Sequence, residues 1–351
     1  MKAVVFHGRE DVRVEDVPEP FPGPGQVKLR TAFCGICGTD VHLYYDPETS
    51  GSDLTQPHPL TGAMAPQILG HEFSGTVVEL GEGVTGLGVG DRVACYPVYW
   101  CGECPSCVAG RHACCPRAGF HGVTSHGGGL AAFTTVLAEQ CIALPDNVDL
   151  RTGALVEPMA VSWRAVRRSG AAANSSVLVI GAGPIGIGVF IALRARGVER
   201  IVVSEPSATR RAAIAGVGAT RVIDPTVTDL AEEVGALTDG DGVDVVIDAA
   251  GVAGPLVQAI DLLAPGGIAV IVGVHSGPIQ VNPLQLLLNE LTLTSVKAYD
   301  KQDFAEALDA MSQGCVDTTG WVEDIGLEDV ERTIVSLRAG QGVKALVTVA
   351  E

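Results

Sequence analysis

The chain has 351 residues, of which 47% are hydrophobic, and it carries a formal net charge of −18 at pH 7. That length is generous for one hydrophobic core, so we expect two domains. The negative charge disfavours binding to nucleic acid phosphates or to an anionic membrane surface. Glycines and Pro184 interrupt the longest apolar stretch, Val177–Leu193, so the sequence predicts no membrane-spanning helix.

The first eight residues are typical of a β-strand and lack the apolar core and cleavage site of a signal peptide. We therefore expect a cytoplasmic protein. In such a chain, ten cysteines favour metal ligation or catalysis over disulfide bonds.

Residues 1 to about 150 predict an irregular, strand-rich domain. Alternating or β-branched patterns predict strands at 12–17, 26–33, 73–80 and 92–96. Prolines and glycines between Pro18 and Gly25 mark a loop.

From about residue 176, short apolar strands alternate with helical segments. The predicted strands are 177–180, 200–204, 221–223, 243–248 and 268–272, and the predicted helices between them are 185–196, 208–215, 230–237 and 255–263. This order favours an α/β fold with a doubly wound parallel sheet. A last apolar strand, 344–349, could return to the first domain.

A glycine motif follows the first of these strands and opens a helix. Gly181 permits a tight turn, Gly183 lets a pyrophosphate approach the backbone, and Gly186 lets the helix pack close to the strand. We expect Pro184 and Ile185 to lie beside the phosphates at the helix start. The alternative is a merely structural turn.

An acidic residue stands at the end of the next strand. Glu205 lies 19 residues after Gly186, which is near the spacing of a carboxylate that binds the adenosine ribose. This favours NAD over NADP. Arg210 and Arg211 point the other way, because a nearby arginine can hold a 2′-phosphate; otherwise they belong to a solvated helix face.

Four cysteines, Cys101, Cys104, Cys107 and Cys115, are spaced as ligands of a structural zinc ion. Four thiolates would fill the coordination shell of the zinc ion, so this site would stabilise a loop and take no part in catalysis. Cys114 leaves the fourth ligand ambiguous. A non-catalytic zinc-ribbon binding protein is the alternative from another class. It predicts basic residues around the cysteines, and the segment has Arg111, His112 and Arg117, but the chain as a whole is acidic.

Three further motifs each have an ordinary explanation when taken alone. The segment Cys34–His42 could be a redox Cys-x-x-Cys motif, His71 in Gly70-His71-Glu72 could be a core histidine, and Leu155–Ala160 could be a helix start. Together, in this order ahead of a dinucleotide-binding pattern, they resemble the zinc-containing medium-chain alcohol and polyol dehydrogenases. The resemblance covers essentially the whole chain.

The resemblance implies a catalytic zinc held by Cys37, His71 and Glu157, the last directly or through water. Glu72 is implied as an occasional ligand. Glu157 departs from alcohol dehydrogenases, which have cysteine there, and agrees with the sorbitol, threonine and butanediol enzymes. Gly38 is a second departure, since some members have arginine at that position.

The resemblance also implies a proton relay through Thr39 and His42, with Asp40 orienting a ligand or the relay. His42 could instead be an ordinary surface histidine. Zinc would act as a Lewis acid on the substrate oxygen, and the nicotinamide of NAD would accept the hydride.

The stretch from His58 to Gly75 resembles the (R,R)-2,3-butanediol dehydrogenases of that family, which have a longer loop before the ligand histidine, here 44–65. This implies a small vicinal diol or acyloin as substrate, such as 2,3-butanediol and acetoin, or reduction of diacetyl. The alternatives are another polyol or secondary-alcohol dehydrogenase, for sorbitol or threonine, a zinc-free quinone reductase relative, and a silent binding protein.

After the last predicted sheet strand, Gly273, Val274 and His275 are expected to border the nicotinamide, where His275 is either functional or a capping group. We expect residues 1–154 and 295–351 to form a GroES-like catalytic domain and residues 155–294 to form a Rossmann domain. We also expect a homodimer or homotetramer.

Overall fold

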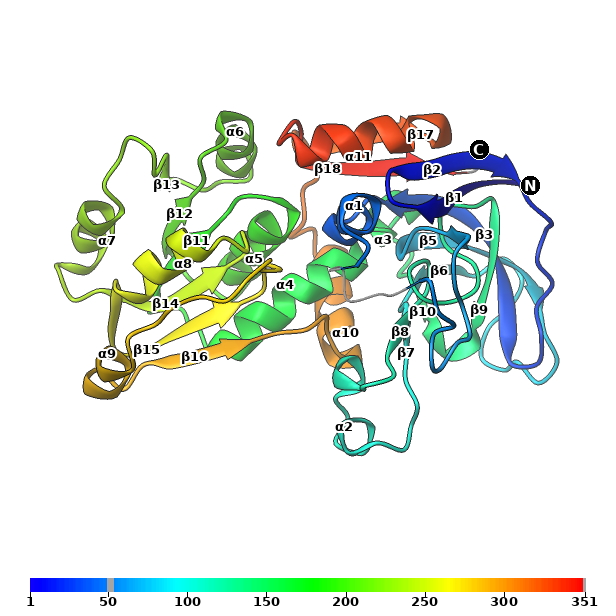
Figure 1. Cartoon of the computed structure of the whole chain (residues 1–351), viewed down its shortest axis with the longest axis horizontal. Helices are drawn as coiled ribbons and strands as arrows, with labels where there is room; N and C mark the ends of the chain where they lie inside the picture. Colours follow the sequence, from blue (N-terminus) through cyan, green and yellow to red (C-terminus); the bar gives the residue numbers. More distant parts are fainter. Residues whose placement is uncertain (49–53, 350–351) are drawn as a thin grey trace. The chain divides into compact units, whose positions relative to one another are not determined.

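The computed structural model describes residues 1–48 and 54–349; residues 49–53 of the expected loop 44–65 lie outside the described residues. The chain divides into two compact units (Figure 1). Unit 1 comprises Met1–Glu157 and Val322–Glu351, and unit 2 comprises Pro158–Trp321. No helix in the described ranges is long and apolar enough to cross a membrane.

The expected boundary at residue 295 differs from this division, because residues 295–321 belong to unit 2. Two contacts explain the difference. Strand β16 (Thr292–Ser295) pairs with β15 (Leu263–Ile271) in the parallel sheet. Helix α10 (Lys301–Ser312) is tied to α4 (Val156–Ser169), because Arg164 and Arg167 bind Asp300 and Asp303 at 2.6–2.9 Å.

Unit 1 is strand-rich, as expected. Its strands are β1 (Lys2–Gly8), β2 (Asp11–Asp16), β3 (Gln26–Gly35), β4 (Gln67–Ile68), β5 (Glu72–Leu80), β6 (Arg92–Cys95), β7 (Val98–Tyr99), β8 (Gly119–Phe120), β9 (Phe133–Leu137), β10 (Cys141–Ala143), β17 (Val322–Gly326) and β18 (Lys344–Thr348). Its short helices are α1 (Gly38–Tyr45), α2 (Pro105–Val108), α3 (Leu150–Gly153) and α11 (Val330–Arg338).

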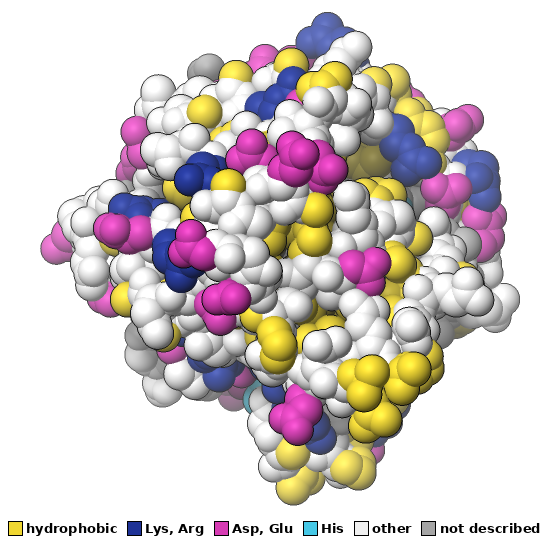
Figure 2. Space-filling model, turned by 90° about the vertical axis from the view of Figure 1, so that its left-hand side faces the viewer, with side chains coloured by type: hydrophobic (Ala, Val, Ile, Leu, Met, Phe, Trp, Pro, Cys, Tyr) yellow, Lys and Arg dark blue, Asp and Glu magenta, His cyan; other side chains and the backbone are white. Residues whose placement is uncertain are grey.

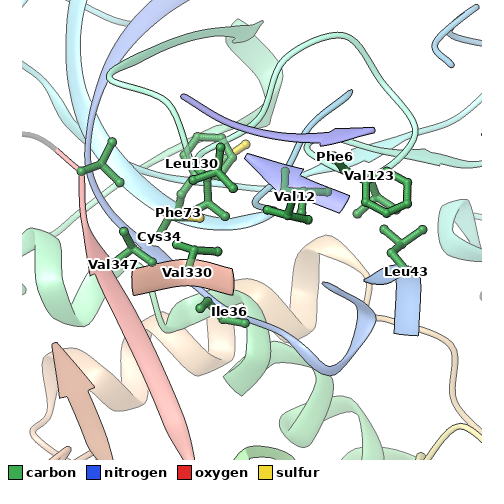
Figure 3. Packing of buried hydrophobic residues seen from close by; sticks show 14 of the residues in the cluster. Phe6, Val12, Cys34, Ile36, Leu43, Phe73, Val123, Leu130, Val330 and Val347 are labelled. Atoms are coloured by element: carbon green, nitrogen blue, oxygen red, sulfur yellow. The ribbon is translucent and has the colours of Figure 1, made fainter. Parts of the chain in front are cut away.

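The main sheet of unit 1 has the order β10-β6-β5-β3-β18-β17, and β9 also pairs with β3. The carboxyl-terminal strand β18 therefore lies beside β3, which confirms that the tail returns to the first domain. Apolar side chains from β3, β5, β18 and α11 form one buried core that includes Cys34, Phe73, Val330 and Val347 (Figure 3). Because side chains alternate along a strand, Phe73 enters this core while Glu72 points to the other face of the sheet.

Unit 2 confirms the doubly wound parallel sheet. Its order is β13-β12-β11-β14-β15-β16, and every neighbouring pair is parallel. The other strands are β11 (Ser176–Ile180), β12 (Arg200–Ser204), β13 (Val222–Ile223) and β14 (Val243–Asp248), and the other helices are α5 (Pro184–Ala195), α6 (Ala208–Gly216), α7 (Leu230–Thr238), α8 (Ala253–Ile260) and α9 (Pro283–Leu288).

Strand β11 lies in the middle of this sheet and is buried on both faces. Leu178 and Ile180 join the core formed by α7 and α8, while Val177 and Val179, which alternate with them, are also completely buried. Since β11 is paired with β12 on one side and β14 on the other, the chain reverses its direction of winding here. Such a switch point is where open parallel sheets bind ligands, at the carboxyl ends of the strands.

Candidate active site

Three of the expected metal-site side chains lie together in unit 1. The sulfur of Cys37, an imidazole nitrogen of His71 and a carboxylate oxygen of Glu72 all lie within 4.8 Å of one another. His71 and Glu72 are buried and Cys37 is half-buried. Sulfur, imidazole and carboxylate donors at this separation suit a zinc ion.

Local structure fixes these three positions. Cys37 precedes α1, and its backbone N–H donates to the Asp40 carboxylate at 2.8 Å. Glu72 is the first residue of β5 and pairs with Gly35 of β3, and His71 directly precedes it. Gly70 has a φ of 102°, and a Cβ there would lie 2.6 Å from the sulfur of Cys34, so only glycine fits this turn.

The polar atoms around His71 support a cation site. His71 Nδ1 and Asp40 Oδ1 are buried 3.8 Å apart, and neither has a hydrogen-bond partner among the described residues. Burial and the charge of Glu72 raise the pKa of the Cys37 thiol. Burial by itself would lower the pKa of His71, but the negative charges of Cys37 and Asp40 hold it well above its usual range. Zinc binding to these donors would therefore be coupled to the release of protons.

Lys344 is a member of this site that the sequence analysis missed. It begins β18, and its ammonium group donates to Glu72 and, at 2.8 Å, to the carbonyl oxygen of Ile36. The Lys344 and Glu72 side chains are each only 1% exposed. A lysine at the start of an otherwise apolar strand was the one available signal, since a buried lysine requires a partner.

Glu157 contributes charge to the cluster but does not belong to the group of Cys37, His71 and Glu72. It is buried in the first turn of α4, and its negative charge contributes to raising the pKa of His71 and of Lys344. Its carboxylate is not among the donor atoms within 4.8 Å of one another. The structure therefore groups Glu72 with Cys37 and His71, whereas the expected ligand Glu157 is not part of that group.

The two expected relay residues lie on α1. The hydroxyl oxygen of Thr39 is 3.7 Å from the sulfur of Cys37. His42 is half-buried and follows Thr39 by three residues, so both side chains are on the same side of the helix. Thr39 is therefore positioned beside the metal cluster, with an imidazole further along the same face.

The four-cysteine loop converges as its spacing predicted. The sulfur atoms of Cys101, Cys104, Cys107 and Cys115 all lie within 4.8 Å of one another, whereas Cys114 is exposed and outside the group. Backbone N–H groups of Cys107 and Arg117 donate to the sulfurs of Cys104 and Cys115 at 3.4 Å. Hydrogen bonds, chiefly from the Glu103 backbone, lower the pKa of Cys101 to about 6, which favours the thiolate that binds zinc.

The glycine motif forms a turn between β11 and α5. Gly181 has a φ of 91°, and a Cβ on Gly186 would lie 2.0 Å from the Gly181 carbonyl oxygen. Gly183 immediately precedes α5, and a Cβ there would meet nothing within 4 Å. Pro184 and Ile185 form the first turn of α5, and because proline has no N–H, the helix-start donors that a phosphate could meet begin with the N–H of Ile185.

Glu205 stands just after β12 and is buried. Its carboxylate accepts hydrogen bonds from the backbone N–H groups of Ala182 at 2.8 Å and Ser207 at 2.7 Å, which ties it to the glycine turn. Arg211 is engaged with the Glu205 and Pro206 carbonyls and with Asp224. Arg210 differs, because its buried Nε has no partner among the described residues.

Gly273 and Val274 follow β15 at the carboxyl edge of the sheet, and Val274 is exposed. Asp248, which was not predicted from the sequence, ends β14 and is completely buried. Its carboxylate lies 2.6 Å from Nε2 of His275. An acidic residue closing an apolar strand was the only sequence signal for this pair.

Two family models match the chain. Residues 23–146 match the alcohol dehydrogenase GroES-like domain, and residues 184–313 match the zinc-binding dehydrogenase domain. These matches fall on unit 1 and unit 2 respectively.

Individual relatives are similar over most of the chain. An (R,R)-butanediol dehydrogenase of Bacillus subtilis is 38% identical over 90% of this chain and 89% of its own length. A 2-dehydro-3-deoxy-L-galactonate 5-dehydrogenase of Pseudoalteromonas atlantica is 34% identical over 99% of this chain and 98% of its own length. Among solved structures, the 2R,3R-butanediol dehydrogenase from Bacillus subtilis superposes with a TM-score of 0.91, 36% identity and 99% coverage of both chains.

Proposed function

This chain belongs to the zinc-containing medium-chain alcohol dehydrogenase family, and from that premise we propose that it interconverts a small vicinal diol and its acyloin. The proposed substrate and product are (R,R)-2,3-butanediol and acetoin. The observation that carries this proposal is the similarity to an (R,R)-butanediol dehydrogenase across 90% of the chain. The relative that acts on 2-dehydro-3-deoxy-L-galactonate makes a hydroxylated sugar acid the second candidate substrate.

The family uses zinc and a nicotinamide dinucleotide. When bound, zinc polarises the substrate oxygen as a Lewis acid, and NAD accepts the hydride. We propose that Cys37, His71 and Glu157 are the residues of this chain that hold the catalytic zinc, with Glu72 as an alternate ligand. The clustering of Cys37, His71 and Glu72 supports the site, and the buried charge of Glu157 suits a position at its margin.

Thr39 and His42 are proposed to carry the substrate proton away. The position of the Thr39 hydroxyl beside the Cys37 sulfur supports this role, and His42 on the same helix face would pass the proton to solvent. Asp40 holds the N–H of Cys37 and lies near His71, so it would orient both ligands.

The Cys101, Cys104, Cys107 and Cys115 sulfurs are proposed to bind a structural zinc ion. Four thiolates leave no open coordination position, so this ion would stabilise the loop without taking part in catalysis.

In unit 2, the turn from Gly181 to Gly186 is proposed to bind the pyrophosphate of NAD, and Glu205 its adenosine ribose. A carboxylate at that point repels the 2′-phosphate of NADP, so NAD should be preferred. Arg210, with its uncommitted Nε, is proposed to approach the adenosine phosphate region, and Gly273 and Val274 to border the nicotinamide.

The direct test is NAD-dependent oxidation of (R,R)-, meso- and (S,S)-2,3-butanediol, with sorbitol, threonine and 2-dehydro-3-deoxy-L-galactonate alongside, before and after zinc chelation. We expect an R-configured butanediol to exceed the other substrates in kcat/KM by about tenfold or more, and chelation to abolish the activity. Turnover of a polyol or sugar acid with butanediol inert would reject the diol. The absence of chelator-sensitive turnover would reject the catalytic assignment of the zinc site.

We also propose that two copies of the chain associate through one edge of unit 2. Strand β16 ends the parallel sheet, so its outer edge has no partner strand within the described residues. Beside it, Leu284, Leu287 and Leu288 of α9 are 58–72% exposed. Hydrophobic side chains gather in this region at the lower right of the face in Figure 2.

A second copy suits this surface, because two identical strand edges can pair about a twofold axis and cover both sets of leucines. A charged variant, Leu287→Glu, should shift the mass measured by light scattering from dimer to monomer. Glu232→Gln on α7 is a control away from this edge. A wild-type chain that is monomeric at micromolar concentration would reject the proposal, and a tetramer would require an additional interface.

A further inference from the structure

Asp248 organises two loops at the carboxyl edge of the parallel sheet. Its Oδ1 accepts hydrogen bonds from the backbone N–H groups of Ala250 at 3.0 Å and Gly251 at 3.1 Å. Its backbone carbonyl accepts from the N–H groups of Val272 and Gly273, each at 2.9 Å. Its Oδ2 is 2.6 Å from Nε2 of His275. One buried residue therefore holds both the loop after β14 and the loop after β15.

Close backbone contact makes this arrangement rigid. A Cβ on Gly273 would lie 2.2 Å from the backbone nitrogen of Gly251, and a Cβ on Gly251 would lie 2.4 Å from the carbonyl oxygen of Val274. No side chain larger than hydrogen fits between the loops. The direction of the His275 ring is consequently set by the fold and by Asp248, and not by a flexible loop.

The position of His275 relative to β11 indicates which half of the cofactor it would meet. Glu205 follows β12, on the side of β11 that is proposed to bind the adenosine ribose. Asp248 and His275 follow β14 and β15, on the opposite side of the switch point. A dinucleotide that crosses the switch point with adenosine near β12 extends its nicotinamide half toward β14 and β15.

We propose that His275 is a cofactor-binding residue that offers Nδ1 to the nicotinamide half of NAD, with Asp248 as its positioning residue. When Nε2–H donates to Asp248, Nδ1 carries a lone pair that can accept from the carboxamide N–H or a ribose hydroxyl. The His275 side chain is 13% exposed, so a ligand can reach it, whereas Asp248 is wholly buried. The proposal rests on use of NAD and not on the identity of the alcohol.

The test measures equilibrium binding of NADH, ADP-ribose and ADP to the zinc-loaded protein, without any alcohol. His275→Gln retains a group that can reach Asp248 but removes the nitrogen at the Nδ1 position. We expect it to weaken NADH binding about 3- to 10-fold, as for loss of one hydrogen bond, and to leave ADP binding unchanged. The neighbouring exposed residue provides the control Ser276→Ala, which should bind all three ligands like the parent.

ADP-ribose locates the contact, because it has the second ribose but no nicotinamide. A loss shared by NADH and ADP-ribose assigns Nδ1 to the ribose, and a loss confined to NADH assigns it to the carboxamide; both support the proposal. Unchanged NADH binding, or equal losses for NADH and ADP, would overturn it. Asp248→Asn should likewise weaken NADH binding and leave ADP binding unchanged. If this variant does not fold, the binding measurements on His275→Gln are sufficient to test the proposal. Failure of the diol assay has no bearing on these measurements.

Discussion

The ammonium group of Lys344 donates a hydrogen bond to the carboxylate of Glu72, and both side chains are almost completely buried beside the proposed zinc ligands. The pair joins the carboxyl-terminal strand to the strand that follows His71. Burial alone would lower the pKa of Lys344, but the charges of Glu72 and Cys37 raise it, so the lysine stays protonated. The ion pair thereby holds the Glu72 side chain in place beside the metal cluster.

Loss of Lys344 should destabilise unit 1. Lys344→Met leaves the buried Glu72 carboxylate without its charged partner, which costs about 3–5 kcal/mol of unfolding free energy. Urea unfolding of the zinc-loaded protein measures the change. The exposed pair between Lys2 and Asp16 supplies the control, since Lys2→Met should change stability by less than about 1 kcal/mol. Equal effects of the two variants would contradict the buried pairing, and adding Glu72→Gln to Lys344→Met should recover part of the loss.

The space for this ion pair depends on Gly35. A Cβ at Gly35 would lie 2.0 Å from a Glu72 carboxylate oxygen and 3.0 Å from Lys344 Nζ. Gly35→Ala should therefore displace the pair and lower the unfolding free energy by about 1–3 kcal/mol, whereas Gly38→Ala, which meets nothing within 4 Å, should not. Thermal unfolding of both variants makes the comparison. A stable Gly35→Ala protein would show that Glu72 can relax without cost.

The four-cysteine loop makes a sharp prediction about metal content. Cys115→Ser should reduce bound zinc from about two ions per chain to about one, because one of four thiolates is lost. The adjacent exposed cysteine gives a matched control, and Cys114→Ser should keep both ions. Elemental analysis after gel filtration measures the number of zinc ions bound per chain. Retention of two ions by Cys115→Ser would mean that Cys115 is not a required ligand.

His121 should contribute to acid sensitivity. It is completely buried among Tyr99, Ser125 and Thr134, and burial lowers its pKa to about 3. The unfolded chain, in which histidine titrates near 6.5, binds this proton first, so stability is present above about pH 6.5 and falls as the pH drops toward 3.

The slope attributable to His121 should approach about 1 kcal/mol per pH unit within this range. The urea midpoints of the parent and of His121→Gln are measured between pH 7 and pH 5. Loss of zinc affects both proteins, so the difference between their pH profiles gives the contribution of His121. The variant should be less stable at pH 7 but lose less stability on acidification. Parallel pH profiles would show that His121 is not neutral in the folded protein.

Glu205 should set the preference for NAD. Glu205→Gln removes the negative charge and keeps an acceptor oxygen for only one of the two N–H groups, those of Ala182 and Ser207, that donate to separate oxygens of Glu205. We expect the ratio of kcat/KM for NAD to that for NADP to fall by about tenfold or more, since charged hydrogen bonds contribute about 1.5–3 kcal/mol. Arg210→Ala in the same background should reduce use of NADP. An unchanged ratio would remove Glu205 from the ribose site.

Features encoded by neighbouring residues were predictable from the sequence by itself. The spacing of Cys101 to Cys115, the glycine turn from Gly181 to Gly186 and the predicted strands 200–204 and 243–248 agree with the structure, because loops, turns and strand periodicity depend on residues close along the chain. The clustering of Cys37 with His71 required the family resemblance, since nothing local joins them.

Only the tertiary structure decided which distant side chains meet. Lys344 and Glu72 are 272 residues apart, and they meet because the register of β18 and β5 on β3 aims both toward the same side of the sheet. A shift of one residue would send either side chain to the opposite face. Likewise, the assignment of residues 295–321 to unit 2 depends on the pairing of β16 and on the arginine–aspartate contacts of α10, and Asp248 reaches His275 because parallel strands end at a common edge. Patterns along the chain determined the elements, and strand register determined the charge partners within the candidate site.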